Sequence, residues 1–235
     1  MGAGPLPRVE PTDHPPRPPI PIVPVDAEAM AAARERGAGE LAVWLAGVTG
    51  AQRPVVRSRT VWAESVIERR ADRATGAEAA SSEPALTVPE VAQAVDAGRD
   101  LAARAAAQAI TLVVARSQGP AEGTQTVVAR SQDPADGARG AALIAALADD
   151  PAHPLRSLRR LGNAEIAVLC GVALGAGERG LGCVCEGLAA LAGAAVAAAI
   201  EPTLRPRLRA ADGHEQAAQV GIAAVDVQEL AAVLD

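Results

Sequence analysis

Hydrophobic positions change their spacing twice between residues 158 and 214. Residues 166–176 are apolar at helical spacing, a glycine break follows, and a short apolar run then ends in Glu186-Gly187 before a second helical pattern over residues 188–200. This pattern predicts a helix, a strand and a helix in that order. Ligands of open α/β sheets bind beyond the carboxyl ends of the strands, so Glu186 and Gly187 are candidate site residues. The alternative interpretation of Glu186 is a surface acid at the end of a strand.

The N-terminal third of the chain shows the same alternation of helix and strand. Residues 26–50 are predicted to form one helix that Asp26 caps. Its buried face is expected to consist of Leu41, Trp44, Leu45 and Val48. Alternating apolar residues over positions 53–65 then predict a strand.

A capping box with proline in the first turn, Thr87-Val88-Pro89-Glu90, predicts the start of a helix that continues to about residue 108. Asp96, Arg99 and Asp100 are three or four residues apart and are expected on its solvated face.

A tandem repeat overlaps a buried strand predicted over residues 110–115. The first copy, VVARSQGPAEGTQT, begins at residue 113, and the second, VVARSQDPADGARG, begins at residue 127. The second copy leads into a helical pattern over residues 141–148, which gives the strand, loop and helix layout of a phosphate-binding turn around Gly137 and Gly140. With so few glycines, an ordinary connection between elements is the simpler interpretation.

Together these elements predict an α/β fold, a Rossmann-like parallel sheet flanked by helices and rich in helix. Residues 215–220 and 227–234 add two short helices. Residues 1–26 hold much of the proline and are expected to form an extended arm, docked or disordered, with a PxxP partner ligand as the alternative. Residues 27–235 are expected to form a single α/β domain.

Composition narrows the function classes. The chain of 235 residues has no Phe, Tyr or Lys, so all 22 basic residues are arginine, and the core has to be packed with Ala, Val, Leu and Ile. The net charge of −6 argues against binding to nucleic acid or to an anionic membrane. The apolar residues 181–200 are long enough for a membrane span, but they are mostly Ala and Gly and include a glutamate, so no span is predicted.

The three cysteines argue for a reducing, cytoplasmic location and against a disulfide framework, and no signal peptide is seen. Cys183 and Cys185 are expected on opposite faces of their strand, and further ligands are lacking, so no metal site is predicted. Cys170 is expected to be a small buried hydrophobe.

From Leu161 onward the chain resembles the nicotinate-nucleotide–dimethylbenzimidazole phosphoribosyltransferase family. Gly162-Asn163-Ala164-Glu165-Ile166 is similar to the family's Gly-Gly-apolar-Glu-Ile element, and Glu186-Gly187 stands where the family has Asp-Gly after an apolar strand. Asp212-Gly213-His214 is similar to its Glu-Pro-Gly-His turn. Upstream, residues 41–50, 85–102 and the second repeat copy follow the family in the same order.

The resemblance implies a Rossmann-like fold, a homodimer, and no metal or other cofactor. It implies the transfer of phosphoribose from nicotinate mononucleotide to dimethylbenzimidazole, in the synthesis of the lower ligand of cobalamin. The partners are then a small nucleotide and a benzimidazole-type base. The phosphate is expected near Gly137, Arg139 and Gly140, and the substrates near Gly162, Glu165, Glu186, Gly187, Asp212, Gly213 and His214.

The chain also departs from the family. The family's general-base glutamate belongs to an Arg-Leu-Gly-Glu-Gly element, and the sequence ends at Asp235 before any such element. Its Asn-Thr-Thr phosphate loop is replaced by Asp136-Gly137-Ala138, and its phosphate-binding lysine has no counterpart. The catalytic residue is therefore not identified, and a catalytically inactive relative that binds ligands or subunits is the alternative to an enzyme.

Overall fold

The computed structural model describes residues 21–62, 86–116, 134–211 and 215–234. In the described residues, five parallel strands form one sheet in the order β1-β2-β3-β4-β5, which confirms the predicted fold class. The strands are β1 (Ser58–Trp62), β2 (Leu112–Arg116), β3 (Gly182–Glu186), β4 (Leu208–Ala210) and β5 (Ala223–Ala224). Strands β2 and β3 are the buried centre of the sheet.

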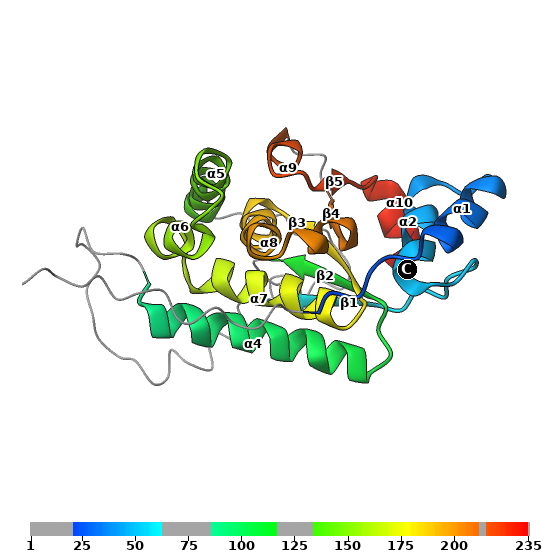
Figure 1. Ribbon diagram of the computed structural model, residues 1–235, viewed down its shortest axis with the longest axis horizontal. Coiled ribbons are helices and arrows are strands. Elements are labelled where there is room, and N and C mark those ends of the chain that lie inside the picture. Colours follow the sequence, from blue (N-terminus) through cyan, green and yellow to red (C-terminus); the bar gives the residue numbers. More distant parts are fainter. Residues whose placement is uncertain (1–20, 63–85, 117–133, 212–214, 235) are drawn as a thin grey trace, which may run out of the picture.

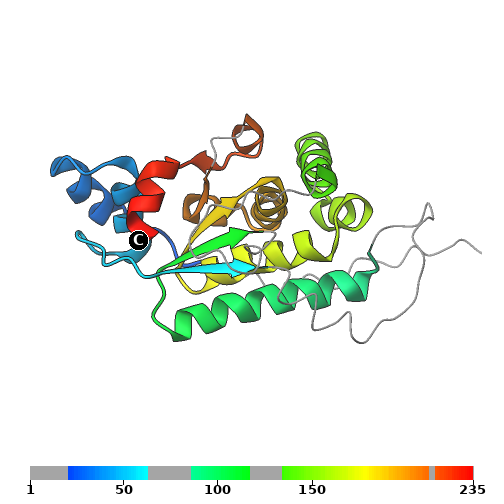
Figure 2. The same ribbon diagram turned by 180° about the vertical axis from the view of Figure 1, so that it is seen from behind.

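Helices cover both faces of this sheet. The helices before and between the first strands are α1 (Ala27–Glu35), α2 (Glu40–Thr49), α4 (Val88–Ala107), α5 (Pro134–Asp149), α6 (Pro154–Leu161) and α7 (Ala164–Glu178). After β3 come α8 (Leu188–Ile200), the 3-10 helix η1 (Pro202–Arg207), α9 (Glu215–Gln219) and α10 (Val227–Leu234). In Figures 1 and 2, α1, α2 and α10 gather at one end of the molecule and α5 and α6 at the other.

Alternate residues of a strand point to opposite faces of the sheet, and the two faces pack against different helices. Leu112 and Val184 face α2 and α10, where Trp44 fills the core. The Trp44 indole N–H donates to Pro206 O at 2.8 Å, which confirms its predicted role as a core anchor. Cys183 and Cys185 both face the layer of α4, α7 and α8. The prediction that they face opposite sides was wrong, because residues two apart on a strand share a face.

Small residues let α4 and α7 lie backbone against backbone (Figure 1). A Cβ at Gly98 would collide with the Val168 carbonyl, and one at Gly171 would collide with the Val95 carbonyl. This close approach builds a dense core without phenylalanine or tyrosine, because backbone atoms take the place of large side chains.

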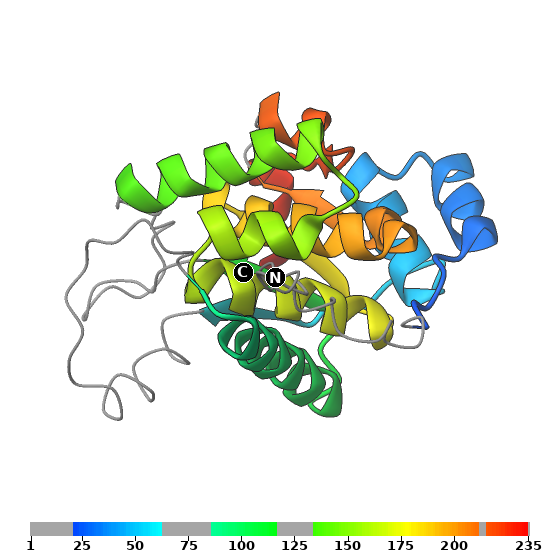
Figure 3. The same ribbon diagram turned by 60° about the vertical axis from the view of Figure 1, so that its left-hand side comes forward.

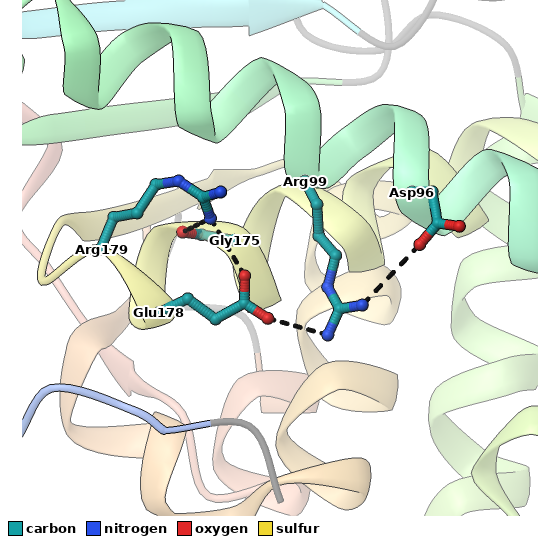
Figure 4. A network of polar contacts seen from close by, with 5 residues as sticks. All are labelled: Asp96, Arg99, Gly175, Glu178 and Arg179. Carbon is teal, nitrogen blue, oxygen red and sulfur yellow. Dashed lines mark hydrogen bonds and ion pairs between the residues drawn. The ribbon is translucent and has the colours of Figure 1, made fainter. Parts of the chain in front are cut away.

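The Arg99 side chain was predicted to be solvated, but the structure places it in contacts between two helices. Its guanidinium lies 2.8 Å from the Glu178 carboxylate on α7 and 3.7 Å from Asp96 on its own helix (Figure 4). Arg179 contacts the same Glu178 at 3.0 Å and donates to Gly175 O at 3.2 Å. The network therefore joins α4 to the C-terminal end of α7.

Two predicted helix boundaries were wrong. Residues 26–50 form two helices and not one, because Gly37 adopts a left-handed φ of 73° between them, where glycine is strongly favoured. The helix predicted from residue 141 begins at Pro134, since proline has its φ preset for the first helical position. The capping box Thr87–Glu90 and the Asp26 cap are confirmed.

The strand predicted over residues 53–65 is confirmed at residues 58–62 as β1; residues 53–57 are not in a strand, and residues 63–65 lie outside the described part. The strand predicted over residues 110–115 is β2, formed by the first repeat copy. Residues 1–20 of the predicted arm and the first part of the second repeat copy also lie outside it. Residues 22–24 of the arm dock on the fold, where Val23 N donates to Gly177 O at 3.2 Å. No helix in the described segments is long and apolar enough to cross a membrane; residues 181–200 form β3 and α8.

Candidate active site

The carboxyl ends of the two central strands carry a pair of opposite charges. Arg116 ends β2 and Glu186 ends β3, and the parallel register places these two residues side by side. Arg116 Nε donates to Glu186 Oε2 in an ion pair whose side chains are only 14% and 6% exposed. An ion pair so far removed from water needs well-fixed geometry to be tolerated, which suits a site that orients a ligand.

Gly187 turns the chain directly from Glu186 into helix α8. Its φ of 85° lies in the left-handed region, which only glycine adopts at little cost. Gly187 is the N-cap of α8 and offers no side chain to the first-turn N–H groups. Glu186 therefore directly precedes the N-cap of helix α8.

The predicted phosphate turn is helical. Gly137, Arg139 and Gly140 all lie in α5, which begins at Pro134, so the interpretation of a loop at these positions is wrong. Only the first four N–H groups of a helix lack partners within it, which leaves Gly137 as the last residue with an available amide. Arg139 is exposed and Gly140 is buried.

Gly140 instead permits a close helix contact. A Cβ there would lie 2.7 Å from Leu188 O and 3.1 Å from Ala189 N, whereas one at Gly137 would meet only Leu188 Cδ1 at 3.9 Å. The first turns of α5 therefore pack against the start of α8, immediately after Glu186-Gly187. Gly137 therefore lies near Leu188, which follows Glu186-Gly187 in the chain.

Glu165 lies in the first turn of α7 and is half-buried. Asn163 caps this helix by accepting from Ile166 N at 2.9 Å. Gly162 joins α6 to α7 and is buried, and a Cβ there would lie 2.6 Å from Leu158 O. The close packing on Leu158 therefore explains the glycine at position 162. Helices α7 and α8 both run antiparallel to the strands, so the N-terminus of α7, where Glu165 lies, is at the same edge of the sheet as Glu186.

The remaining predicted residues, Asp212, Gly213 and His214, lie outside the described part of the chain. The residue before them, Ala211, donates to Cys185 O at 2.9 Å and so follows the carboxyl end of β4 beside β3. Across the described segments, no group of three His, Cys, Asp or Glu side chains gathers as a metal site would require.

Sequence reasoning missed Arg116. It treated the second repeat copy as the one at the site, whereas the first copy supplies strand β2 and its terminal arginine. The available signal was a basic residue directly after four apolar ones, at the same position relative to a strand end as Glu186.

Comparisons with known proteins agree with the sequence resemblance. The phosphoribosyltransferase family matches residues 133–235. The fold is similar to that of CobT from Thermus thermophilus, with 21% identity over 85% of this chain and 88% of the other and a TM-score of 0.61. A second similar structure is the nicotinate-nucleotide–dimethylbenzimidazole phosphoribosyltransferase of the same organism, with 22% identity over 89% and 92% of the chains and a TM-score of 0.60.

No curated protein matches the chain in sequence. The described chain nevertheless has the parallel α/β fold of these structures, and the family match lies over residues 133–235, where the sequence motifs were found. The resemblance predicted from the sequence is therefore confirmed over residues 133–235, which match the phosphoribosyltransferase family, and the two solved structures share the fold of the described chain.

Proposed function

We propose that this chain transfers phosphoribose from nicotinate mononucleotide to dimethylbenzimidazole, a step in making the lower ligand of cobalamin. The observation that carries the proposal is the buried Arg116–Glu186 pair at the carboxyl edge of a sheet with this fold. Glu165, Gly187 and Asp212-Gly213-His214 are proposed to contribute to the same site, and α5 to contribute through Gly137, Arg139 and Gly140.

The reaction needs a group that accepts a proton. The bond from the ribose carbon to nicotinate breaks, a benzimidazole nitrogen forms the new bond to that carbon, and the other ring nitrogen loses its proton. We assign Glu186 as the carboxylate that accepts this hydrogen bond and proton. Arg116 is a positioning residue, because its guanidinium holds one carboxylate oxygen and so fixes the direction of the other.

The direct test is the release of nicotinate. Purified protein with nicotinate mononucleotide and dimethylbenzimidazole should release nicotinate, and Glu186→Gln should lower kcat by about 100-fold or more, the usual contribution of an acid–base group. Glu35→Gln, an exposed acid at the end of α1, is the matched control and should leave kcat unchanged.

The alternative, a catalytically inactive relative, predicts a different result. Calorimetry would then show that nicotinate mononucleotide or dimethylbenzimidazole binds while no nicotinate appears. A protein that neither binds nor reacts would leave only a role in interaction with other subunits. Since the proposed substrates are small intracellular molecules, we propose a cytoplasmic protein with residues 27–235 as the functional unit, and a homodimer that light scattering would detect.

A further inference from the structure

Helix α6 concentrates positive charge on one side. Its sequence PLRSLRRL places Arg156, Arg159 and Arg160 three and four residues apart, so the three Cα atoms share one helical face. Leu158 points the opposite way and is fully buried. The three residues Arg156, Arg159 and Arg160 are called the α6 arginine face below.

None of these arginines is neutralised in the described part of the chain. The ion pairs found there join Arg99, Arg116, Arg179 and His153 to glutamate or aspartate, and none involves the α6 arginine face. Arg156 and Arg160 are exposed. Arg159 is half-buried and its Nε donates to Leu86 O at 3.5 Å, which restrains the guanidinium while leaving its two outer nitrogens available.

Helix α6 lies at the end of the molecule where the candidate active site is found. Helix α6 runs through Gly162 into the N-cap of α7 and packs on α5 and α8. Leu86, just before α4, donates to Arg159 O at 3.3 Å, which ties α6 to the start of α4. Figures 1 and 3 show α6 beside α5 at the end toward which β2 points.

We propose that the α6 arginine face binds the phosphate group of a small phosphorylated molecule. Guanidinium groups form paired hydrogen bonds with phosphate, and three of them within five residues match the size of one such group. A nucleic acid would need a basic surface for about 6–10 phosphates, whereas this chain has a net charge of −6. The identity of the phosphorylated molecule rests on the proposed function, whereas the presence of a phosphate site on α6 does not.

The test compares two variants with equal loss of charge. Calorimetry with ribose 5-phosphate, and with ribose as the unphosphorylated control, is run on the wild type and on Arg156→Gln/Arg159→Gln/Arg160→Gln. The matched control is Arg53→Gln/Arg57→Gln/Arg104→Gln, which removes three exposed arginines from β1's approach and from α4. We expect ribose 5-phosphate to bind while ribose does not, with Kd rising about tenfold or more in the α6 variant and less than about twofold in the control.

Equal affinities in the two triple variants would overturn the inference, because they would show only a general effect of charge. It would also be overturned if ribose 5-phosphate failed to bind the wild type while an oligonucleotide bound through α6. Thermal unfolding of both variants checks the fold, and the single exposed change Arg156→Gln serves if the triple variant unfolds. Nicotinate release is measured in a separate assay, so the binding of ribose 5-phosphate can be interpreted even if the proposed reaction does not occur.

Discussion

Two arginines are removed from solvent at opposite edges of the sheet, and their surroundings differ. At the amino edge, Arg207 is 1% exposed and donates to four backbone carbonyls, those of Val23, Pro24, Val48 and Gly180. At the carboxyl edge, Arg116 is paired with the Glu186 carboxylate. One guanidinium therefore joins three backbone segments, and the other pairs with a carboxylate side chain.

This difference separates a structural arginine from one at a candidate site. Carbonyl groups are neutral and fixed in the backbone, so within the described segments no carboxylate forms an ion pair with Arg207, and burial lowers the pKa of its guanidinium. The Arg116–Glu186 pair can exchange its contacts for those of a ligand, because both partners are side chains. The arginine at the amino edge is thus expected to make the fold rigid, and the ion pair at the carboxyl edge is expected to take part in ligand binding and chemistry.

The largest expected effect is at the amino edge. Arg207→Met would leave four carbonyls, one buried and three partly buried, without this donor, and at about 1–3 kcal/mol for each unsatisfied group that stays dry the free energy of unfolding should fall by about 4 kcal/mol. Urea unfolding measures it. Arg205→Met, an exposed neighbour, is the control and should change stability by less than about 0.5 kcal/mol. Equal effects would mean that the carbonyls are satisfied without Arg207.

At the carboxyl edge, replacing only Arg116 should lower the free energy of unfolding more than replacing both Arg116 and Glu186. Arg116→Met leaves a buried carboxylate behind and should lower the free energy of unfolding by about 3 kcal/mol, whereas Arg116→Met/Glu186→Leu should stay within about 1 kcal/mol of the wild type. Urea unfolding of the two variants checks this. A double variant as unstable as the single one would show that the pair holds the sheet together and would remove the contrast with Arg207.

The contact of α5 with α8 gives the next effect. Gly140→Ala would place a methyl group 2.7 Å from Leu188 O and should destabilise by about 2 kcal/mol, the usual cost of overpacking. Gly137→Ala lies on the same helix with room for the methyl group and should instead stabilise by up to about 1 kcal/mol. Thermal unfolding of the two variants should therefore shift in opposite directions.

The thiols between the two edges predict a dependence on pH. Burial raises the pKa of Cys170 to about 12, and contact with Cys183 followed by burial raises that of Cys185 well above its usual value. A raised pKa in the folded state means stability that is complete below the unfolded value, near 9, and is lost above it. Ionisation of Cys170 should therefore lower the free energy of unfolding by up to about 1.4 kcal/mol per pH unit between about pH 9 and 12, and Cys185 should add to the fall above about pH 9. Urea unfolding of wild type and Cys170→Ala should show a shallower fall for the variant.

The smallest effect is expected at the start of α4. Thr87→Ala removes the capping box and should cost about 1 kcal/mol. The hydrogen bonds from Thr87, first from its backbone and then from its side chain, lower the pKa of Glu90. That contribution is present above the unfolded pKa of 4.5 and is lost as the pH falls through the lower folded pKa, so the stability difference between wild type and variant should shrink at acidic pH to the part due to the helix cap. Thermal unfolding at about pH 7 and about pH 3 checks it.

The sequence determined the local elements. Apolar spacing predicted β2, α7, β3 and α8, and the side chains of Asp26 and Thr87 predicted the caps that the structure shows, since each signal depends only on residues a few positions apart. Glu186 followed in the same way, from the end of an apolar run. The break at Gly37 was missed because the small and flexible residues there are also compatible with a helix.

Only the tertiary structure decided which distant residues meet. Arg116 reaches Glu186, 70 positions away, because parallel pairing aligns the ends of β2 and β3, and Arg207 reaches Val23 across 184 positions. The reason for glycine at positions 98, 140 and 171 is visible only in the structure, where the backbone of another helix packs against each of them. Such contacts depend on how layers pack in space, and a periodic sequence pattern records which face of an element is buried but not what it is buried against.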